Sequence, residues 1–436
     1  MPGGASRRAA KKTPRTGHQR SPRARIGLAL AGGGPLGAIY EIGALLALAE
    51  SLQGVDLTEV DVYVGVSSGG FVAAALANGI SPAQMYQLFI ADGDNALSPA
   101  RFLRPAWSEF TRRALSVPNL TASALGDFLR APLRRGALGS FAALGRAVPT
   151  GLFDQRAMHT FLARLFAAEG RSNDFRRLRH KLFLVATNLD SGASVTFGTP
   201  GFDHVRIDRA IAASAALPGL FPPVEIDGEH YVDGALNKTL HASVALDEGV
   251  ELLLCVNPLV PFDANAAARR RRLTVDKIDQ GGLPLVLAQT FRAIIHSRMK
   301  VGMEKYRRQY PRADILLFEP EREDADMFFA NIFSYTDRAR LCEMAYRNTR
   351  QRLLDQRDAL APLLARHGIR LDLAKLEDAQ RPLQAALDDP RPLFVDAPDV
   401  PSLAHALERT LDALEGWLDR DRPPPGTRAS QRSATA

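Results

Sequence analysis

Short apolar runs alternate with longer apolar segments at the start of the chain. Two of the runs, Arg25–Ala31 and Val60–Val64, have the length and composition of buried strands. Each is followed by a stretch that is apolar on almost every side, Ala38–Leu52 and Gly70–Asn78, as is typical of a helix packed in a protein interior. Strands and helices that alternate at this spacing predict a parallel sheet covered by helices.

The pattern changes after a further predicted helix at Ala83–Ala91. Residues Asn95–Pro149 mix proline, arginine and scattered large apolar side chains, which predicts helices with loose connections inserted into the sheet domain. Apolar and basic side chains together suit either a helical subdomain that packs on the core or a lid that faces a lipid interface. Of these two interpretations we favour the subdomain.

The sheet pattern returns in the second half of the chain. Ser194–Phe197 is predicted to pair with the strand Lys181–Asn188, and Asp227-Gly228 has the sequence of a two-residue hairpin turn. The remaining strands are expected at Pro223–Ile226, Glu229–Val232, Glu251–Pro258 and Asp314–Pro320. The helices are expected at Asp154–Ala168, Asp208–Ala216, His241–Asp247, Leu283–Arg308, Asp337–His367 and Leu403–Leu418.

This pattern divides the 436 residues into four parts. Residues 25–320 form the α/β domain with its helical insert at about 95–150, and residues 321–421 form a C-terminal helical region. Residues 1–24 and 422–436 are predicted to be disordered tails, because they hold few apolar side chains.

The basic character of the chain lies in its first 25 residues. They hold eight Lys and Arg and no acid, so the formal net charge of +7 leaves −1 for the rest. A basic tail rich in Pro, Gly and Ser is compatible with peripheral contact with an anionic membrane, with loose binding of nucleic acid, or with a solvated tail that only aids solubility. We expect no nucleic-acid partner, because the folded body is near neutral.

An apolar segment after the basic tail, Ile26–Leu48, imitates a signal peptide or a membrane anchor. Three consecutive glycines, Pro35 and Glu41 interrupt it, no small-residue cleavage site follows, and no other window reaches about 18 uncharged apolar residues. We therefore expect neither a signal peptide nor a transmembrane segment. The two cysteines, Cys255 and Cys342, provide no disulfide framework and no metal cluster, which is compatible with a reducing cytoplasm.

A candidate nucleophile lies at the end of the second predicted strand. The stretch Gly65-Val66-Ser67-Ser68-Gly69 places a serine between two glycines where a strand turns into a helix. Glycines permit the tight turn that presents a nucleophilic hydroxyl at the edge of a sheet. The pattern fits Ser67 rather than Ser68, with Gly65 and Gly69 as supports. A buried, glycine-rich packing turn is the alternative.

A serine nucleophile also needs donors for the negative charge that develops on its substrate. Gly32-Gly33-Gly34-Pro35-Leu36-Gly37 lies between the first strand and a buried helix, so the backbone N–H groups of Gly32, Gly33 and Gly34 are candidates for an oxyanion hole. Phosphate binding is the competing interpretation. The spacing from Gly34 to Gly37 does not fit a dinucleotide loop, and no P-loop sequence is present.

Two Asp-Gly pairs supply candidates for the base. Asp227 has a sufficient role in its hairpin turn, whereas Asp233 ends the returning strand, where it can converge with Ser67 at the sheet edge. A second turn aspartate is the alternative for Asp233. Four histidines that follow Ser67 stand in no distinctive context and are expected to be surface or core residues: His204, His230, His241 and His296.

Together these elements resemble the patatin-like phospholipase family. The glycine loop, the serine elbow and Asp233-Gly234-Ala235 occur in the family's order and spacing, and Ser214–Pro223 resembles its stretch before the aspartate. The resemblance covers about Arg25–Pro258 and extends towards Pro320. It implies an α/β fold: a three-layer α/β/α patatin-like sheet with a helical insertion and a C-terminal helical extension.

The resemblance also implies a chemistry, the hydrolysis of lipid or other acyl esters in the cytoplasm or at a membrane surface. Ser67 would attack the ester, Asp233 would accept the proton, and the Gly32–Gly34 amides would hold the oxyanion, without a metal or organic cofactor. The residues that would support these motifs are Gly37, Gly65, Gly69, Gly234 and Ala235.

The chain departs from the family pattern at three places. Leu36 stands where the family usually carries Arg or Lys, which bears on phospholipid preference more than on ester hydrolysis. Ala235 replaces a commoner glycine, and Asn237-Lys238-Thr239 lacks a proline often found there. Two rival functions stay open: an α/β-hydrolase with a Ser-Asp-His triad, in which the nucleophile normally follows several strands, and a catalytically silent lipid- or partner-binding protein.

Overall fold

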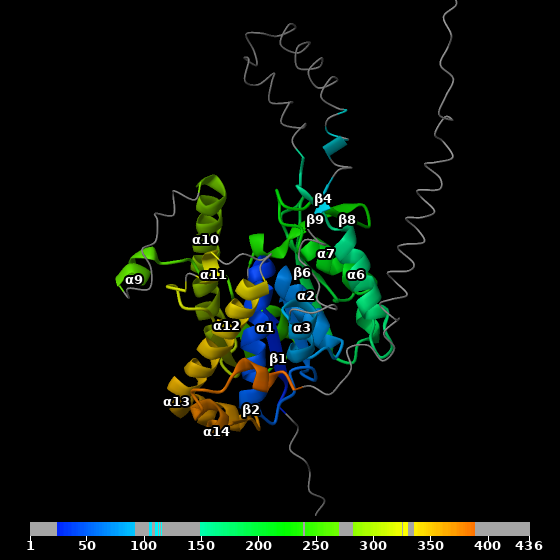
Figure 1. The fold of residues 1–436 in the computed structure, drawn as a ribbon. Coiled ribbons are helices and arrows are strands. Elements are labelled where there is room, and N and C mark those ends of the chain that lie inside the picture. Colours follow the sequence, from blue (N-terminus) through cyan, green and yellow to red (C-terminus); the bar gives the residue numbers. More distant parts are fainter. Residues whose placement is uncertain are drawn as a thin grey trace, which may run out of the picture. The chain divides into compact units, whose positions relative to one another are not determined.

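A mixed sheet forms the centre of the fold (Figure 1). The computed structural model describes residues 24–91, 104–106, 110–111, 113, 115, 149–238, 240–269, 282–324, 326–329 and 335–388. Within these residues the sheet has eight strands, in the order β11-β10-β1-β3-β6-β9-β8, with β7 also paired to β6. Five neighbouring strands run parallel: β11 (Asp314–Phe318), β10 (Leu252–Val256), β1 (Ile26–Leu30), β3 (Val62–Val66) and β6 (Lys181–Asn188).

The remaining strands of the sheet run antiparallel to their neighbours. They are β9 (Glu229–Asp233), β8 (Val224–Ile226) and β7 (Ser194–Phe197). The hairpin between β8 and β9 turns at Asp227 and Gly228, which have φ of 54° and 82°. Positive φ at both positions is the geometry of a type I′ turn, which confirms the predicted hairpin. The sheet is therefore parallel from β11 across to β6 and antiparallel where β7, β9 and β8 are added.

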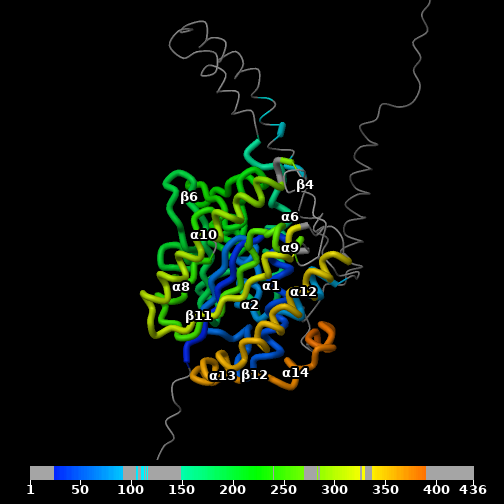
Figure 2. Tube along the Cα trace, turned by 90° about the vertical axis from the view of Figure 1, so that its left-hand side faces the viewer, coloured from blue at the N-terminus to red at the C-terminus, as the bar shows by residue number. Residues whose placement is uncertain are grey.

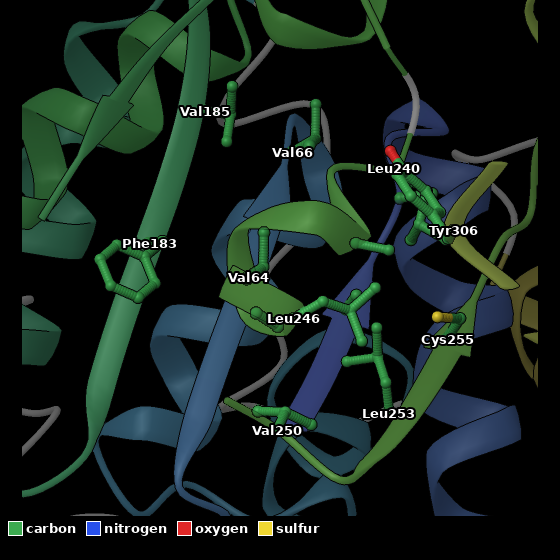
Figure 3. Packing of buried hydrophobic residues seen from close by; sticks show 14 of the residues in the cluster. Val64, Val66, Phe183, Val185, Leu240, Leu246, Val250, Leu253, Cys255 and Tyr306 are labelled. Carbon is green, nitrogen blue, oxygen red and sulfur yellow. The ribbon is translucent and has the colours of Figure 1, made fainter. Parts of the chain in front are cut away.

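Helices cover both faces of the sheet and make three layers. One face packs against α8 (Ala242–Asp247) and α10 (Gly282–Gln309), whose buried side chains meet those of β1, β3, β6 and β10 (Figure 3). The other carries α1 (Gly34–Ser51), α2 (Ser68–Ala77) and α7 (Ile207–Ser214). The central strands are buried on both faces, which explains their continuous apolar sequences. The predicted α/β/α architecture is confirmed.

The C-terminal helices pack on the outside of α1. The long helix α12 (Tyr335–Asp355) lies along α1, and Gly43 permits this close approach: a Cβ there would lie 2.2 Å from the carbonyl oxygen of Cys342. Glu50 at the end of α1 forms ion pairs with Arg350 and Arg381. The described residues all belong to one compact unit that ends at Pro390.

Further short elements complete the described part of the chain. The helices are α3 (Pro82–Phe89), α6 (Arg156–Ala167), α9 (Ala264–Arg269), α11 (Asp326–Phe329), α13 (Arg357–Arg366), α14 (Leu373–Glu377), η3 (Phe175–Arg177), η4 (Gly234–Leu236) and η6 (Leu383–Ala386). Two small ladders pair β2 (Leu52–Gln53) with β12 (Arg370–Leu371) and β4 (Arg104–Pro105) with β5 (Phe153–Asp154).

Several sequence predictions lie outside the described residues. These are both tails, most of the insert at about 95–150 and the helix Leu403–Leu418. Within the described residues, no helix combines the length and the apolar character that crossing a membrane requires.

Candidate active site

Ser67 occupies a strained turn between β3 and α2. The strand runs to Val66, two residues further than predicted, and the helix begins at Ser68, so Ser67 alone forms the corner. Its φ is 53°, a conformation that a non-glycine residue adopts only at a cost of about 1–3 kcal/mol. This sharp turn places the side chain at the carboxyl end of the strand, as a nucleophile elbow requires.

The glycines around Ser67 allow the backbone segments to approach closely. A Cβ on Gly65 would lie 2.5 Å from the Cα of Gly70, and a Cβ on Gly69 would lie 2.4 Å from the carbonyl oxygen of Ala31. Neither position has room for a side chain. Gly65 and Gly69 therefore lie at the turn, as predicted, and their lack of a side chain allows its backbone to pack closely.

Ser214, on α7, fixes the backbone of the elbow. The amide of Ser67 donates to the Oγ of Ser214 over 2.8 Å, and that hydroxyl donates in turn to the carbonyl oxygen of Val185 on β6 over 2.6 Å. Ser214 is fully buried, so this chain of bonds is shielded from water. Sequence reasoning did not single out Ser214. The available signal was its place in the stretch before the aspartate that resembles the family.

The strand register brings Asp233 to the same level as Ser67. Val66 pairs with Val185, and Asp233 pairs with the next residue of β6, Ala186. This is possible because β6 extends three residues beyond its pairing with β3, and the antiparallel β9 pairs only with that extension. The carboxyl group consequently meets Ser67 although the two residues are 166 positions apart.

Asp233 and Ser67 share a hydrogen bond in a buried site. The Oγ of Ser67 donates to the Oδ2 of Asp233 over 2.7 Å, and the amide of Ala235 donates to its Oδ1 over 2.8 Å. Only 7% of Ser67 and 3% of Asp233 are exposed. Burial raises the pKa of the Asp233 carboxyl to about 6, and the hydrogen bonds from Ser67 and Ala235 offset part of that rise.

Gly234 and Ala235 hold the chain close to this carboxylate. A Cβ on Gly234 would lie 2.2 Å from the carbonyl oxygen of Val185, so only glycine fits between β9 and β6. Ala235 is buried, and its methyl group packs in the core beside the strands. The residue that departs from the family's commoner glycine is thus accommodated.

The glycine loop lies against the other side of Ser67. A Cβ on Gly32 would lie 2.9 Å from the Cβ of Ser67. Gly33 caps α1, and Gly34, with φ of 62°, is the first residue of the helix, which begins four residues earlier than predicted. The N–H groups at such a position have no acceptor within the helix and carry its positive dipole end. A Cβ on Gly37 would lie 3.0 Å from Pro258 and 3.3 Å from the hydroxyl of Ser68.

None of the described histidines is hydrogen-bonded to the side chain of Ser67 or Asp233, although His241 contacts the backbone of Gly234. Five of them face carboxylates elsewhere: His159 with Asp208, His180 with Glu59, His204 with Asp227, His296 with Glu319, and His367 with Asp314. His230 is exposed on β9, and burial lowers the pKa of His241 to about 4. Within the described residues, no group of three His, Cys, Asp or Glu side chains is arranged to hold a metal ion.

The α/β/α domain, with Ser67 at a sharp turn beside Asp233, was compared with families of known proteins. The family model described as patatin-like phospholipase matches residues 28–246, half of the chain. The protein belongs to the patatin-like phospholipase family. This membership supports hydrolysis of lipid esters as its function.

Solved structures that are similar to this chain include two bacterial proteins and one human protein. VipD from Legionella pneumophila is 16% identical with a TM-score of 0.35, covering 77% of this chain and 67% of its own. The effector ExoU of Pseudomonas aeruginosa is 17% identical with a TM-score of 0.30, covering 77% and 53%. Human group IVD cytosolic phospholipase A2, bound to methyl γ-linolenyl fluorophosphonate, is 15% identical with a TM-score of 0.31, covering 84% and 59%. The chain thus spans between half and two thirds of the lengths of these three proteins. A comparison with curated proteins found no match.

Proposed function

We propose that the protein is a carboxylic ester hydrolase that cleaves lipid acyl esters through Ser67 and Asp233. The observation that carries this proposal is the 2.7 Å hydrogen bond between the two side chains in a buried site. A hydroxyl needs an adjacent base to become a nucleophile, and no histidine of the described residues occupies that place. The geometry supports a dyad rather than a Ser-Asp-His triad.

The reaction follows from the positions of these groups. The Oγ of Ser67 attacks the ester carbonyl carbon while Asp233 accepts the hydroxyl proton. The amides of Gly32, Gly33 and Gly34 and the positive end of α1 stabilise the oxyanion of the tetrahedral intermediate. Collapse of this intermediate expels the alcohol, which takes the proton from Asp233. Water then attacks the acyl-serine while Asp233 accepts its proton. Collapse of the second intermediate releases the fatty acid, and the Oγ of Ser67 takes the proton back from Asp233.

The pKa of Asp233 sets the expected pH dependence. A base must be ionised to accept a proton, and the pKa of this carboxyl lies at about 6. We predict that kcat/KM for a soluble ester rises about tenfold per pH unit below pH 6 and becomes constant above it. Steady-state kinetics between pH 4.5 and 8.5, within the range where the fold is intact by circular dichroism, would measure this. A profile that is flat down to pH 4.5 contradicts Asp233 as the base.

The substrate class is tested by the products. We expect release of fatty acid from a phospholipid, a lysophospholipid or a neutral glyceride, together with the matching deacylated partner, in mass spectra of reactions with each lipid. Leu36 leaves the site without the cation usual in the family, so we predict activity on neutral esters at least equal to that on phospholipids. Absence of fatty acid from every lipid, with folded protein, would favour a catalytically silent lipid-binding protein.

The cellular setting remains a prediction. Both cysteines, Cys255 and Cys342, are buried free thiols. We propose that the enzyme acts in the cytoplasm, where free thiols persist. Contact between the basic N-terminal tail and an anionic membrane also remains a proposal, because that tail lies outside the described residues.

A further inference from the structure

The helix α10 exposes an apolar face. Val286, Leu287, Phe291, Ile294 and Val301 are between 39% and 69% exposed. The steps of four, three and seven residues from Leu287 to Phe291, Ile294 and Val301 place these side chains on one side of the helix. Isolated exposed apolar residues are ordinary, whereas an aligned set marks an interaction surface.

The opposite face of α10 is fixed to the body of the protein. Gln289 exchanges two hydrogen bonds with the backbone of Phe262, and the guanidinium of Arg292 lies over the ring of Phe328, 4.6 Å from its centroid. Further along, Met299 packs in the core, as does Tyr306, which Figure 3 labels. These contacts set the rotation of the helix, so its apolar face is presented outward.

The first half of α10 extends beyond the carboxyl ends of the parallel strands, which form the edge of the sheet where Ser67 and Asp233 meet. Asn257, directly after β10, contacts the Sδ of Met299 over 3.1 Å, which places Met299 where the parallel strands end. Val286 precedes Met299 by 13 residues, about 20 Å of helix. Figure 1 draws the beginning of α10 at the end of the domain where β8 and β9 lie, and Figure 2 shows the helix passing across the sheet. Val301, in contrast, lies beside the sheet.

A second group of exposed leucines lies at the same edge: Leu152, Leu189, Leu217 and Leu220. Leu217 directly follows Ala216, whose carbonyl oxygen accepts the Asp233 amide. The amide of Leu152 donates to Gly219 in that same loop, and Leu189 directly follows β6. We call these four leucines, with Val286, Leu287, Phe291 and Ile294, the apolar rim. The rim holds eight of the eleven large apolar side chains that are exposed in the described residues.

The charged side chains of α10 that precede Glu304 are all basic. From Gly282 to Met303 the sequence contains Arg292, Arg298 and Lys300 and neither Asp nor Glu. Arg298 and Lys300 are exposed. An exposed apolar helix face with exposed cations beside it is a pattern of helices that lie in the surface of an anionic bilayer.

We propose that the apolar rim docks the protein on an anionic phospholipid bilayer. The rim lies at the edge of the sheet where Ser67 and Asp233 meet, so docking would present that edge to the lipids. This role in substrate supply rests on the proposed function. The docking itself depends only on the rim and its cations.

The test uses full-length protein with Ser67→Ala, so that hydrolysis does not alter the vesicles. We expect this protein to co-sediment with vesicles of phosphatidylglycerol and phosphatidylcholine, and less with phosphatidylcholine alone. Adding Phe291→Ser and Ile294→Ser should weaken binding at least about tenfold, because two exposed apolar side chains are lost. Val301→Ser, on the same face but beside the sheet, is the matched control and should change binding less than twofold.

Three results would overturn the proposal: no binding by the Ser67→Ala protein, equal binding by the rim variant, or equal loss with Val301→Ser. If the rim instead contacts a second copy of the chain, the rim variant changes the sedimentation coefficient and leaves vesicle binding unchanged. With Ser67 restored, the rim variant should hydrolyse a soluble short-chain ester normally and vesicle lipid slowly. If the unaltered protein does not hydrolyse the soluble ester, the proposed function is contradicted, whereas the result for vesicle binding still stands.

Discussion

Replacing Ser67 with alanine is expected to lower the rate of ester hydrolysis by at least about 10³-fold. The substitution removes the attacking oxygen but keeps the Cβ that packs beside Gly32, and alanine meets the same strain at this φ as serine does. The melting temperature should therefore stay close to that of the unaltered protein. Initial rates with a soluble p-nitrophenyl ester, measured with the melting curve, check both expectations.

The neighbouring serine offers a matched control. Ser68 begins α2, and its buried hydroxyl has no hydrogen-bond partner within the described residues. Ser68→Ala should therefore retain activity within about threefold, since no interaction is lost. If Ser68→Ala is the inactive variant and Ser67→Ala the active one, the assignment of the nucleophile is wrong.

Asp233→Asn is expected to lower activity by a similar factor, because an amide cannot accept the Ser67 proton. Asparagine has the same shape and can still accept the bond from the amide of Ala235, so the site should keep its geometry. The double variant with Ser67→Ala should be no slower than either single variant, because the two side chains act as one unit. A double variant that is slower by the product of both factors would contradict the dyad.

The same substitution should stabilise the fold at neutral pH. The pKa of Asp233 is about 6 in the folded protein and near 3.8 when unfolded, so the folded state binds the proton more tightly. Stability therefore falls as pH rises from about 4 to 6, by roughly 3 kcal/mol, and stays lower above pH 6. Urea unfolding at pH 8 should show Asp233→Asn to be more stable than the unaltered protein, with a smaller difference at pH 4. For the activity measurement the control is Asp227→Asn, which lies in an exposed turn that asparagine tolerates and should leave activity unchanged.

The parts of this fold that depend on local sequence could be predicted. Continuous apolar runs identified the central strands, and Asp227-Gly228 identified the hairpin because only a few residues accept positive φ at both positions. The family and the three-layer architecture were confirmed by the match over residues 28–246 and by the structure. Ser67 and Asp233 were chosen from their motifs, and the structure brings the two side chains into contact.

The remaining features depend on contacts between distant segments. The sequence did not show that β9 runs antiparallel and pairs only with the end of β6, although this pairing sets the level of Asp233. It did not single out Ser214, whose role appears only when α7 packs beside the elbow. The apolar rim was not foreseen either, because the pattern of α10 predicts a helix without showing which face the body covers.

The central claim, that Ser67 is the nucleophile beside Asp233, is tested most directly by a fluorophosphonate probe. The attacking Oγ forms a bond to phosphorus and fluoride leaves, so the adduct stays on the protein for peptide mass spectrometry. We predict a single adduct on Ser67, none in Ser67→Ala, and labelling at least about 10²-fold slower in Asp233→Asn. An adduct on Ser68, or labelling of Asp233→Asn at the unaltered rate, would contradict the account.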